Sequence, residues 1–431
     1  MSSSSHLRTT AVLALLTAAS ALAAAKGAVD LTALQAASAD RAAGVTRAAT
    51  LSPLNWRYPF ESAELWNAIG RNAEAAQHYR EALRRFPGCA PCWIGLAEAR
   101  AALREPADEA LDKAVKFGRS MPEVRTRAAV LYAKMGEREL AASEFSAALG
   151  GQKDEMESFY EMLHRIYSGD EILDRIVTSA DLESYMNFAL GNLPLRDTAR
   201  VWQALEDSGG HTAWRNPYGG YLARHGHLRD AWSITVGTAG DEGQPLLDPG
   251  FGSGGAEVGF FGWHIRDVEG VRARISTCHD CESGARALRV RFDGERNVNY
   301  FGVSQAVPVL AGNRYALSAR VRYDELSSAR GPQIGVVGIA GSEAGTDCTL
   351  STFAEELRGS SDWRETRVEF EIPAGCAGVK VLIARRQTPK LDRFVGGQLW
   401  VDRVDLQLLG RATEQARHKA LAPPAARSIA G

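Results

Sequence analysis

The stretch IGRNAEAAQHYREALRRFP (residues 69–87) returns further along the chain as MGERELAASEFSAALGG (135–151). A constant offset of 66 residues superposes the two segments. The matched positions are Gly70 with Gly136, Ala75 with Ala141, Tyr79 with Phe145, and Ala82 with Ala148. Half of that offset is about 33 residues, a period typical of stacked helical hairpins. The first half of this 431-residue chain is therefore predicted to be a helical repeat.

A third copy lies between these two segments. The stretch APCWIGLAEARAALREPADEALDKAVKFG (90–118) has the same small-residue spacing, one residue out of step, and weaker copies follow at 191–205 and 221–232. These segments resemble the tetratricopeptide repeat family. In that pattern small residues let paired helices approach, a glycine turns the chain, an aromatic fills the groove against the next repeat, and Pro87 ends the unit. The resemblance implies a superhelix over 51–235 whose concave face holds peptides or a protein partner.

The repeat contains a Cys-x-x-Cys motif, Cys89 and Cys92, within RRFPGCAPCWIG (84–95). In thioredoxin-type enzymes such a dithiol follows a strand in a βαβ unit, whereas helical repeats flank this one on both sides. A helix N-terminus favours a thiolate, so a redox role is the alternative. We expect a structural role.

The chain has six cysteines, an even number that favours disulfides in an oxidising compartment. The simplest of the many connectivities is local, and it pairs Cys89 with Cys92, Cys278 with Cys281, and Cys348 with Cys376. A zinc site built from both Cys-x-x-Cys pairs is the weaker alternative, because the pairs stand far apart in segments of different type.

The N-terminus predicts export. Residues 1–25 combine a weakly positive start with the apolar run AVLALLTAASALAAA (11–25), which is shorter than the roughly twenty residues of a spanning helix. We expect a cleaved signal peptide, or an N-terminal membrane anchor if it is not cleaved, and a leader helix or linker over 26–50. The location is then periplasmic or secreted.

Charge excludes some classes of partner. The formal net charge is −2, charged residues make up 24% of the chain, and no run of Lys or Arg stands out. A nucleic acid or an anionic membrane surface is therefore not an expected partner.

The second half of the chain has a different residue pattern. After a linker at 236–245, residues 246–409 show short alternating segments such as ARALRVRFDG and RYALSARVRYD, with turns between them. Alternation of apolar and polar residues predicts strands with one buried face. The fold class is therefore all-α plus all-β, a helical solenoid followed by an antiparallel β-sandwich, and the tail 410–431 is expected to be disordered.

The landmarks of this half resemble the jelly-roll carbohydrate-binding modules that bind xylan and glucan. They are LLDPGFGSGG with Phe251, FFGWHI with Trp263, a strand carrying Leu288 and Val290, and a closing LWVDRVDLQL. The resemblance implies a jelly roll that contacts polysaccharide.

Sugars are held by aromatic rings that stack on them and by polar groups that bond their hydroxyls. The candidate residues are Trp263, Asn299, Tyr300, Gln305, Arg320 and Trp363. Each aromatic residue, and Trp400 in the last strand, is also typical of a sandwich core.

Many modules of this kind hold a structural calcium, and Asp402 matches one of its ligands by position. Gly252 stands where the family has a glutamate, so only one ligand is carried over and the cation is an open alternative. No other cofactor is expected.

Residues 1–431 contain no nucleophile elbow, zinc-protease motif or phosphate loop. We expect a non-enzymatic adaptor that joins a protein partner to a glycan, as in extracellular polysaccharide assembly or export. The alternatives are a glycan-active enzyme with the sandwich as catalytic domain, and an assembly factor that binds no sugar.

Overall fold

The computed structural model describes the residues 45, 48, 51–151, 156–237, 246–252, 259–281, 284, 286–328, 330–341, 347–389 and 393–410. The predicted signal segment, most of the leader and of the linker, and the tail beyond Gly410 lie outside these residues. The chain divides into two compact units, Met1–Leu205 and Glu206–Gly431. The division precedes the predicted linker, so the last pair of helices belongs to the unit that contains the sheets.

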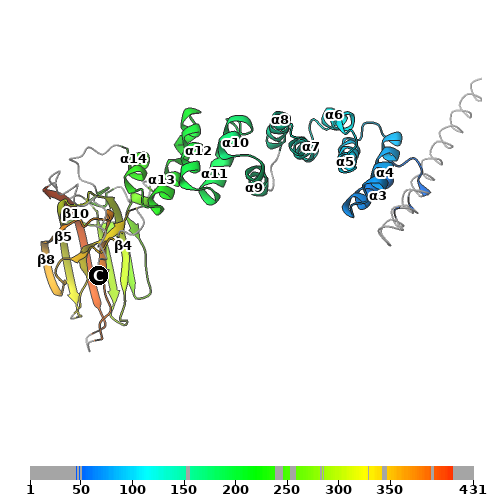
Figure 1. Cartoon of the computed structure of the whole chain (residues 1–431). Coiled ribbons are helices and arrows are strands. Elements are labelled where there is room, and N and C mark those ends of the chain that lie inside the picture. The colour runs from blue at the N-terminus through cyan, green and yellow to red at the C-terminus, as the bar shows by residue number, and fades with distance from the viewer. Residues whose placement is uncertain are drawn as a thin grey trace, which may run out of the picture. The chain divides into compact units, whose positions relative to one another are not determined.

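In the described residues before the sheets, the helix is the only kind of regular secondary structure (Figure 1). In the first unit these are α3 (Arg57–Ala68), α4 (Asn72–Arg85), α5 (Ala90–Ala102), α6 (Asp108–Phe117), α7 (Pro122–Met135), α8 (Arg138–Leu149), α9 (Met156–Ile166), α10 (Gly169–Arg175), α11 (Leu182–Asn192) and α12 (Leu195–Asp207), which crosses the boundary. The second unit opens with the 3-10 helix η1 (Gly210–Trp214), α13 (Arg215–Arg224) and α14 (Leu228–Thr235). None of the helices in the described part of the chain is both long enough and apolar enough to span a membrane.

Successive helices pair, α3 with α4, α5 with α6, and α7 with α8. The glycines that the repeat places in the turns have positive φ, 77° at Gly70, 89° at Gly136 and 82° at Gly226. Only glycine adopts this conformation without steric cost. The turn positions predicted from the repeat are therefore the positions at which the backbone reverses.

Small residues allow neighbouring hairpins to touch. A Cβ added to Gly95 of α5 would lie 2.2 Å from the ring of Tyr79 in α4. Tyr79 is fully buried, and its hydroxyl donates a hydrogen bond to Glu64 of α3. The aromatic of one hairpin thus occupies the space that the missing side chain leaves on the next.

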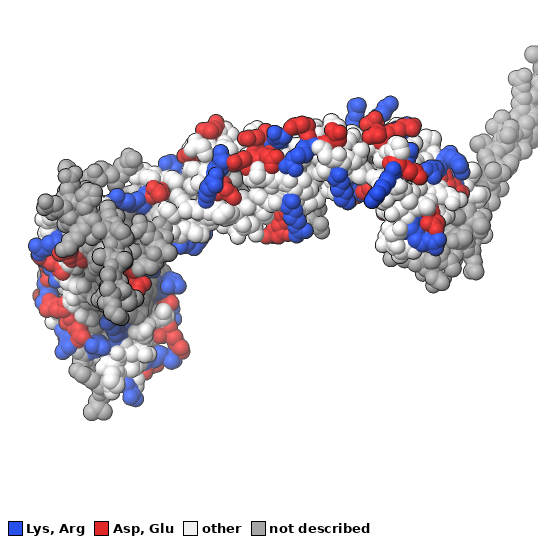
Figure 2. Space-filling model, viewed as in Figure 1, with Lys and Arg blue, Asp and Glu red and all other residues white. Residues whose placement is uncertain are grey.

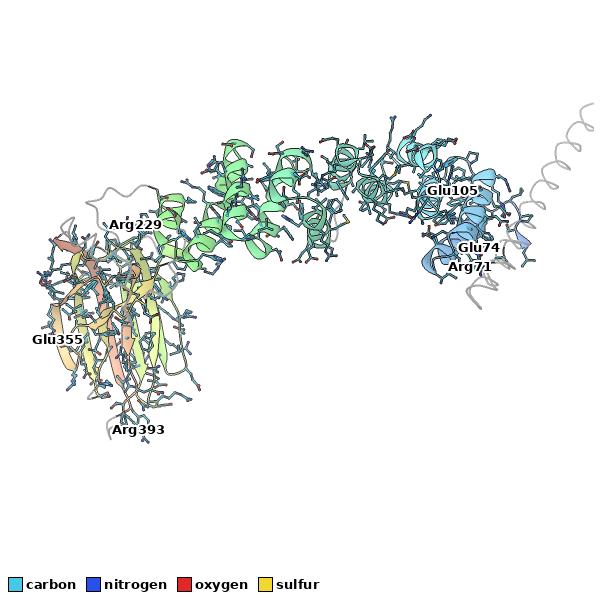
Figure 3. All side chains as sticks on the ribbon, viewed as in Figure 1. Arg71, Glu74, Glu105, Arg229, Glu355 and Arg393 are labelled. Carbon is cyan, nitrogen blue, oxygen red and sulfur yellow. A yellow bond between two sulfur atoms is a disulfide. The ribbon has the colours of Figure 1, made fainter. Side chains whose placement is uncertain are left out.

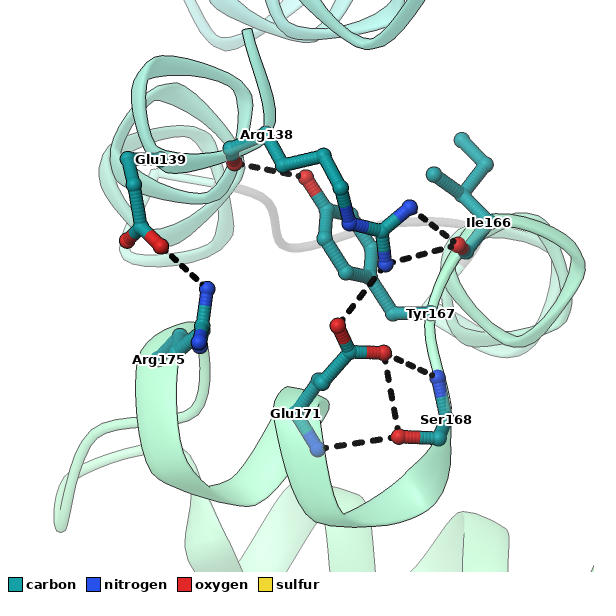
Figure 4. A network of polar contacts seen from close by, with 7 residues as sticks. All are labelled: Arg138, Glu139, Ile166, Tyr167, Ser168, Glu171 and Arg175. Atoms are coloured by element: carbon teal, nitrogen blue, oxygen red, sulfur yellow. Dashed lines mark hydrogen bonds and ion pairs between the residues drawn. The ribbon is translucent and has the colours of Figure 1, made fainter. Parts of the chain in front are cut away.

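A polar network joins α8 to α10 (Figure 4). The Arg138 guanidinium forms an ion pair of 2.8 Å with Glu171 and lies 4.7 Å from the ring centroid of Tyr167. Ser168 and Glu171 form a capping box at the start of α10. Hydrogen bonds from the backbone N–H of Ser168, the Arg138 side chain and the Ser168 hydroxyl lower the pKa of Glu171 to about 2.

We predict that Glu171→Gln makes the helical unit less sensitive to acid. A carboxylate with a lowered pKa stabilises the fold fully above its unfolded value of about 4.3, and this contribution is lost as the pH falls towards the folded value. The Tm of the variant should lie below that of the parent chain at pH 6, and the difference should shrink between about pH 5 and pH 2. Thermal melts across this range, with the exposed Glu183→Gln as control, test the prediction. A difference that is constant with pH would contradict it.

The second unit contains two five-stranded antiparallel sheets. The strands are β1 (His264–Ile265), β2 (Val271–Thr277), β3 (Arg286–Asp293), β4 (Tyr300–Pro308), β5 (Arg314–Leu326), β6 (Gln333–Ala340), β7 (Ser351–Phe353), β8 (Gly359–Glu371), β9 (Cys376–Arg385) and β10 (Gly396–Gly410). One sheet has the order β1-β4-β9-β6-β7 and the other β2-β3-β10-β5-β8. Apolar residues from the inner faces of both sheets form one core, so the predicted β-sandwich is present.

The helical pair α13–α14 packs on the first of these sheets, where α14 contacts β4 and β9. The ring of Trp232 lies 5.0 Å from that of Phe261, in the 3-10 helix η2 (Gly259–Phe261), with an edge-on geometry. A Cβ added to Gly378 would lie 2.7 Å from Cδ1 of Leu228. This contact explains why α13 and α14 form one unit with the sheets.

The six cysteines form the three local disulfides expected from their spacing, Cys89–Cys92, Cys278–Cys281 and Cys348–Cys376. The Cys89 sulfur also accepts a hydrogen bond from the backbone N–H of Cys92 at the start of α5. Three disulfides indicate an oxidising compartment.

Candidate functional site

The outer face of the sheet β2-β3-β10-β5-β8 carries a row of arginine and tryptophan side chains. Strand register aligns Arg274 with Arg289, Arg289 with Trp400, and Trp400 with Arg322, and the Arg322 guanidinium lies over the ring of Trp363 on β8. We call Arg274, Arg289, Trp400, Arg322 and Trp363 the central row. The core-facing neighbours on these strands are Val290, Leu399 and Val401, among others. Because strand residues alternate between faces, burying these neighbours turns the central row outward.

Guanidinium groups hold the two tryptophan rings in place. The Arg322 guanidinium lies 4.6 Å from the ring centroid of Trp400 and 5.1 Å from that of Trp363. That of Arg289 lies 5.4 Å from Trp400 and donates two hydrogen bonds to the side-chain oxygen of Gln398. Both rings are half-buried, so each retains accessible surface.

Asp280 completes this arrangement from a loop. Its carboxylate pairs with Arg322 and accepts a hydrogen bond of 3.2 Å from Nε1 of Trp363. Asp280 lies between Cys278 and Cys281, which form one of the disulfides. The disulfide therefore restrains the loop that supplies the shared carboxylate.

Three of the residues predicted to bind sugar are interior residues instead. Trp263 is 7% exposed, packs on Phe251 and donates from Nε1 to the Asp248 carbonyl. Tyr300 is fully buried, its hydroxyl donates to the Arg266 carbonyl, and burial raises its pKa well above the ordinary range. Both side chains are therefore buried and bonded to the backbone.

Gln305 is the third of these interior residues. Its side chain is fully buried, accepts a hydrogen bond from the backbone N–H of Leu247 and donates one to the Leu247 carbonyl. The paired bonds tie the segment before β1 to β4. The correction has a physical reason, because a buried amide must satisfy its polar atoms and here the backbone does so.

The remaining candidates are accessible but are not all together. Trp363 and Arg320 lie on the outer face that carries the central row. Asn299 lines a shallow depression with Gln387 and Phe394. Arg393, the residue before Phe394 in the sequence, lies at one end of the sandwich (Figure 3). Of the residues predicted from the sequence, two thus lie on the outer face of this sheet and one lies in a separate depression.

The calcium alternative finds no support around Asp402. This residue is fully buried in β10, and no cluster of three or more His, Cys, Asp or Glu side chains that could hold a metal ion occurs among the residues described. Its position next to a shift in the β10–β5 register places it at an irregularity of the strand.

Apart from Arg320, sequence reasoning missed the arginines of the outer face. Their signal is visible in the sequence, because Arg-x-Arg occurs in three strands, at Arg272 and Arg274, at Arg289 and Arg291, and at Arg320 and Arg322. Each motif places two arginines on one face of a strand. Only strand pairing shows that the three motifs meet on the same face of one sheet.

No family model matches the sequence, and no curated protein matches it either. Similar solved structures include the CBM22-1 xylan-binding domain from Paenibacillus barcinonensis Xyn10C, with 14% identity over 40% of this chain and 100% of that one and a TM-score of 0.26. The CBM22-1–GH10 modules of Clostridium thermocellum endo-1,4-β-D-xylanase 10B match with 13% identity over 36% of this chain and 27% of that one, at a TM-score of 0.25. The crystal structure of MamA matches with 13% identity over 38% of this chain and 87% of that one, at a TM-score of 0.27. These scores are too low to support a shared fold or function.

Proposed function

We propose that this protein is an exported, non-enzymatic adaptor. Its β-sandwich contacts a polysaccharide through the outer face of the sheet β2-β3-β10-β5-β8, and its helical unit, a solenoid of tetratricopeptide type, recruits a protein partner. The role fits the assembly or export of extracellular polysaccharide. The observation that carries the proposal is the pair Trp400 and Trp363, which face outward on either side of Arg322.

A sandwich normally buries its tryptophans, because each ring removes a large apolar area from water. Here two of them lie on the outer face of one sheet and keep accessible surface. Their ring orientation is restrained by Arg322 and Asp280. A restrained, accessible ring suits the apolar face of a sugar, and the nearby Gln398 amide and guanidinium groups suit its hydroxyls.

The helical unit offers a different kind of surface. Arg127 of α7 forms a two-pronged ion pair with Glu98 of α5 and lies 3.6 Å from Glu64 of α3. These residues come from the first helices of three successive hairpins, so one polar line crosses the repeat. On the face drawn in Figure 2, acidic and basic side chains are interspersed along the helices. Such a mixed surface suits a folded or extended protein segment more than a polyanion.

The three disulfides support the exported part of the proposal, because such bonds persist in secreted or periplasmic proteins. The predicted signal segment agrees with this location. Whether that segment is removed decides between a free and an anchored protein, and the mass of the mature chain tests it.

We predict that Trp400→Ala and Trp363→Ala each lower the affinity for the glycan that the protein binds about tenfold or more, because each removes a stacking ring. Binding of the full chain to a panel of plant and bacterial polysaccharides measures this. The matched control is Phe301→Ala, which removes an exposed aromatic ring from β4 of the other sheet. Equal loss in all three variants, or none in the tryptophan variants, would contradict the proposed face.

The same preparations separate the alternatives. Release of reducing ends from a bound polysaccharide, abolished by one acid-to-amide change, would indicate an enzyme in place of an adaptor. Failure to bind any polysaccharide, with the fold intact by circular dichroism, would indicate an assembly factor without sugar binding.

A further inference from the structure

Four arginines form a compact block on β2 and β3, and two of them also belong to the central row. Arg272 and Arg274 on β2 lie directly opposite Arg291 and Arg289 on β3, pair by pair, and all four project from the outer face of the sheet. Directly opposed residues in an antiparallel pair are about 5 Å apart. We call Arg272, Arg274, Arg289 and Arg291 the arginine block.

Two like-charged pairs in successive register positions destabilise a sheet. If these charges served only to keep the surface of the sheet soluble, arginines would be expected to lie opposite acidic residues. This is the case at the other end of the same sheet, where Arg314 and Arg367 both pair with Glu369. The arginine block is therefore an arrangement that folding alone does not favour.

Carboxylates of the chain neutralise the arginine block only in part. Asp267 lies 3.7 Å from Arg272, whose side chain is 72% exposed. Arg289 uses the neutral Gln398 amide, and neither Arg274 nor Arg291 has an ion pair within the described parts of the chain. Asp280, the carboxylate nearest the tryptophans, is already engaged by Arg322 and Trp363.

The arginine block and the tryptophans share one surface. Arg274 and Arg289 belong to both the block and the central row, and Arg289 contacts the Trp400 ring directly. The positions beside Arg291 along the sheet are Gln398 and then Asp324. A chain of sugars lying across the strands would therefore meet a stacking ring and several guanidinium groups in turn.

From this arrangement we infer that the glycan recognised by the outer face is anionic, a polysaccharide whose sugars carry carboxylates. This inference rests on the proposed function and names its substrate class. Guanidinium groups bind carboxylates with two parallel hydrogen bonds, while Trp400 and Trp363 stack on the rings. The tryptophans select a sugar, and the arginine block selects the charge.

The test compares polygalacturonate and alginate with the carboxyl-reduced form of polygalacturonate, which has the same backbone without charge. The full chain should bind the carboxylated polymers at least about tenfold more tightly, and added NaCl should weaken this binding because salt screens exposed charges. The double variant Arg274→Gln/Arg291→Gln should lower the affinity for the carboxylated polymers about tenfold. Among the residues that the structure describes, neither arginine bonds to another side chain, so the fold should be unchanged.

The control is Arg314→Gln/Arg367→Gln, which removes the same charge from the same face of the sheet but away from the arginine block. It should leave the affinity unchanged. Equal loss in both double variants, or equally tight binding of duplex DNA, would show attraction to any polyanion and overturn the inference. Failure to bind either carboxylated polymer would also overturn it.

These outcomes are distinct from failure of the proposed function. If the carboxyl-reduced polymer binds as tightly as its parent and only Trp400→Ala weakens it, the face binds a neutral glycan and the inference alone falls. If no polymer binds, both fall.

Discussion

Arg385→Met should lower the free energy of unfolding of the second unit by on the order of 3 kcal/mol or more. Arg385 ends β9 and is fully buried. Its guanidinium donates hydrogen bonds to five acceptors, which are the carbonyl oxygens of Val298, Arg330 and Arg393, Oδ1 of Asn297 and Oγ of Ser328. Methionine keeps the apolar stem and removes every donor, so buried acceptors lose their partner.

In the described part of the chain, none of the five groups that accept hydrogen bonds from Arg385 is a carboxylate. Burial lowers the pKa of Arg385, and the nearby Arg330 lowers it further. One cation thus joins backbone segments that are far apart in the sequence, around 298, 330 and 393. Arg385→Lys should also destabilise, because an ammonium has only three donors and lacks the planar fork.

Urea unfolding followed by circular dichroism measures the effect. The matched control is Arg386→Met, the next residue, which is exposed and makes a hydrogen bond of 3.3 Å to Ser351. It should change the unfolding free energy by about 0.5 kcal/mol or less. Similar midpoints for Arg385→Met and the parent chain would show that water replaces the lost donors.

Gly95→Ala should destabilise the helical unit by about 2 kcal/mol, although alanine is the better helix former. The added Cβ would lie 2.2 Å from the ring atom Cζ of Tyr79 and 2.5 Å from both Cε1 and the hydroxyl oxygen. Tyr79 is fully buried and hydrogen-bonded to Glu64, so its ring cannot move aside without breaking that contact. The α4–α5 contact must open, and this opening costs packing energy.

A second helical glycine provides the control. Gly191 in α11 has no atom within 4 Å of an added Cβ, so Gly191→Ala should stabilise by about 0.5–1 kcal/mol. In the double variant Tyr79→Leu/Gly95→Ala the clash is removed, and its loss of stability should be smaller than the sum of the two single losses. Additive losses would contradict the close approach.

The helical half was predictable because its signal is local. Small and aromatic residues recur every turn or two, so Gly70, Tyr79 and Gly136 could be assigned to turns and contacts from spacing alone. The disulfide pairing was also predictable from local spacing, because in two of the three pairs the cysteines are only three residues apart. The packing of α13 and α14 on the sheets was not predictable from local spacing. Leu228 contacts β9 at Gly378, which is far along the chain, and Trp232 contacts Phe261 in η2.

The candidate site was predicted less well. Aromatic and amide residues in strands are equally typical of a core and of a binding face, and Trp263, Tyr300 and Gln305 proved to be core residues. Trp400 shows the opposite case, since its sequence context is typical of a core residue but its ring faces outward. Its neighbours Leu399 and Val401 are the core residues. Alternation assigns a strand two faces but does not label one of them as the interior.

The sequence by itself therefore determined that this chain has a helical half, a set of alternating strands and locally paired cysteines. Each of these follows from interactions within a few dozen residues. The tertiary structure alone decided that Arg274, Arg289, Trp400, Arg322 and Trp363 form one row. The contact between Arg289 and Gln398 spans 109 residues of sequence, and it exists because the strand order β2-β3-β10-β5-β8 brings the last strand between two earlier ones. Strand order depends on burying the common core of both sheets, and no local pattern encodes it.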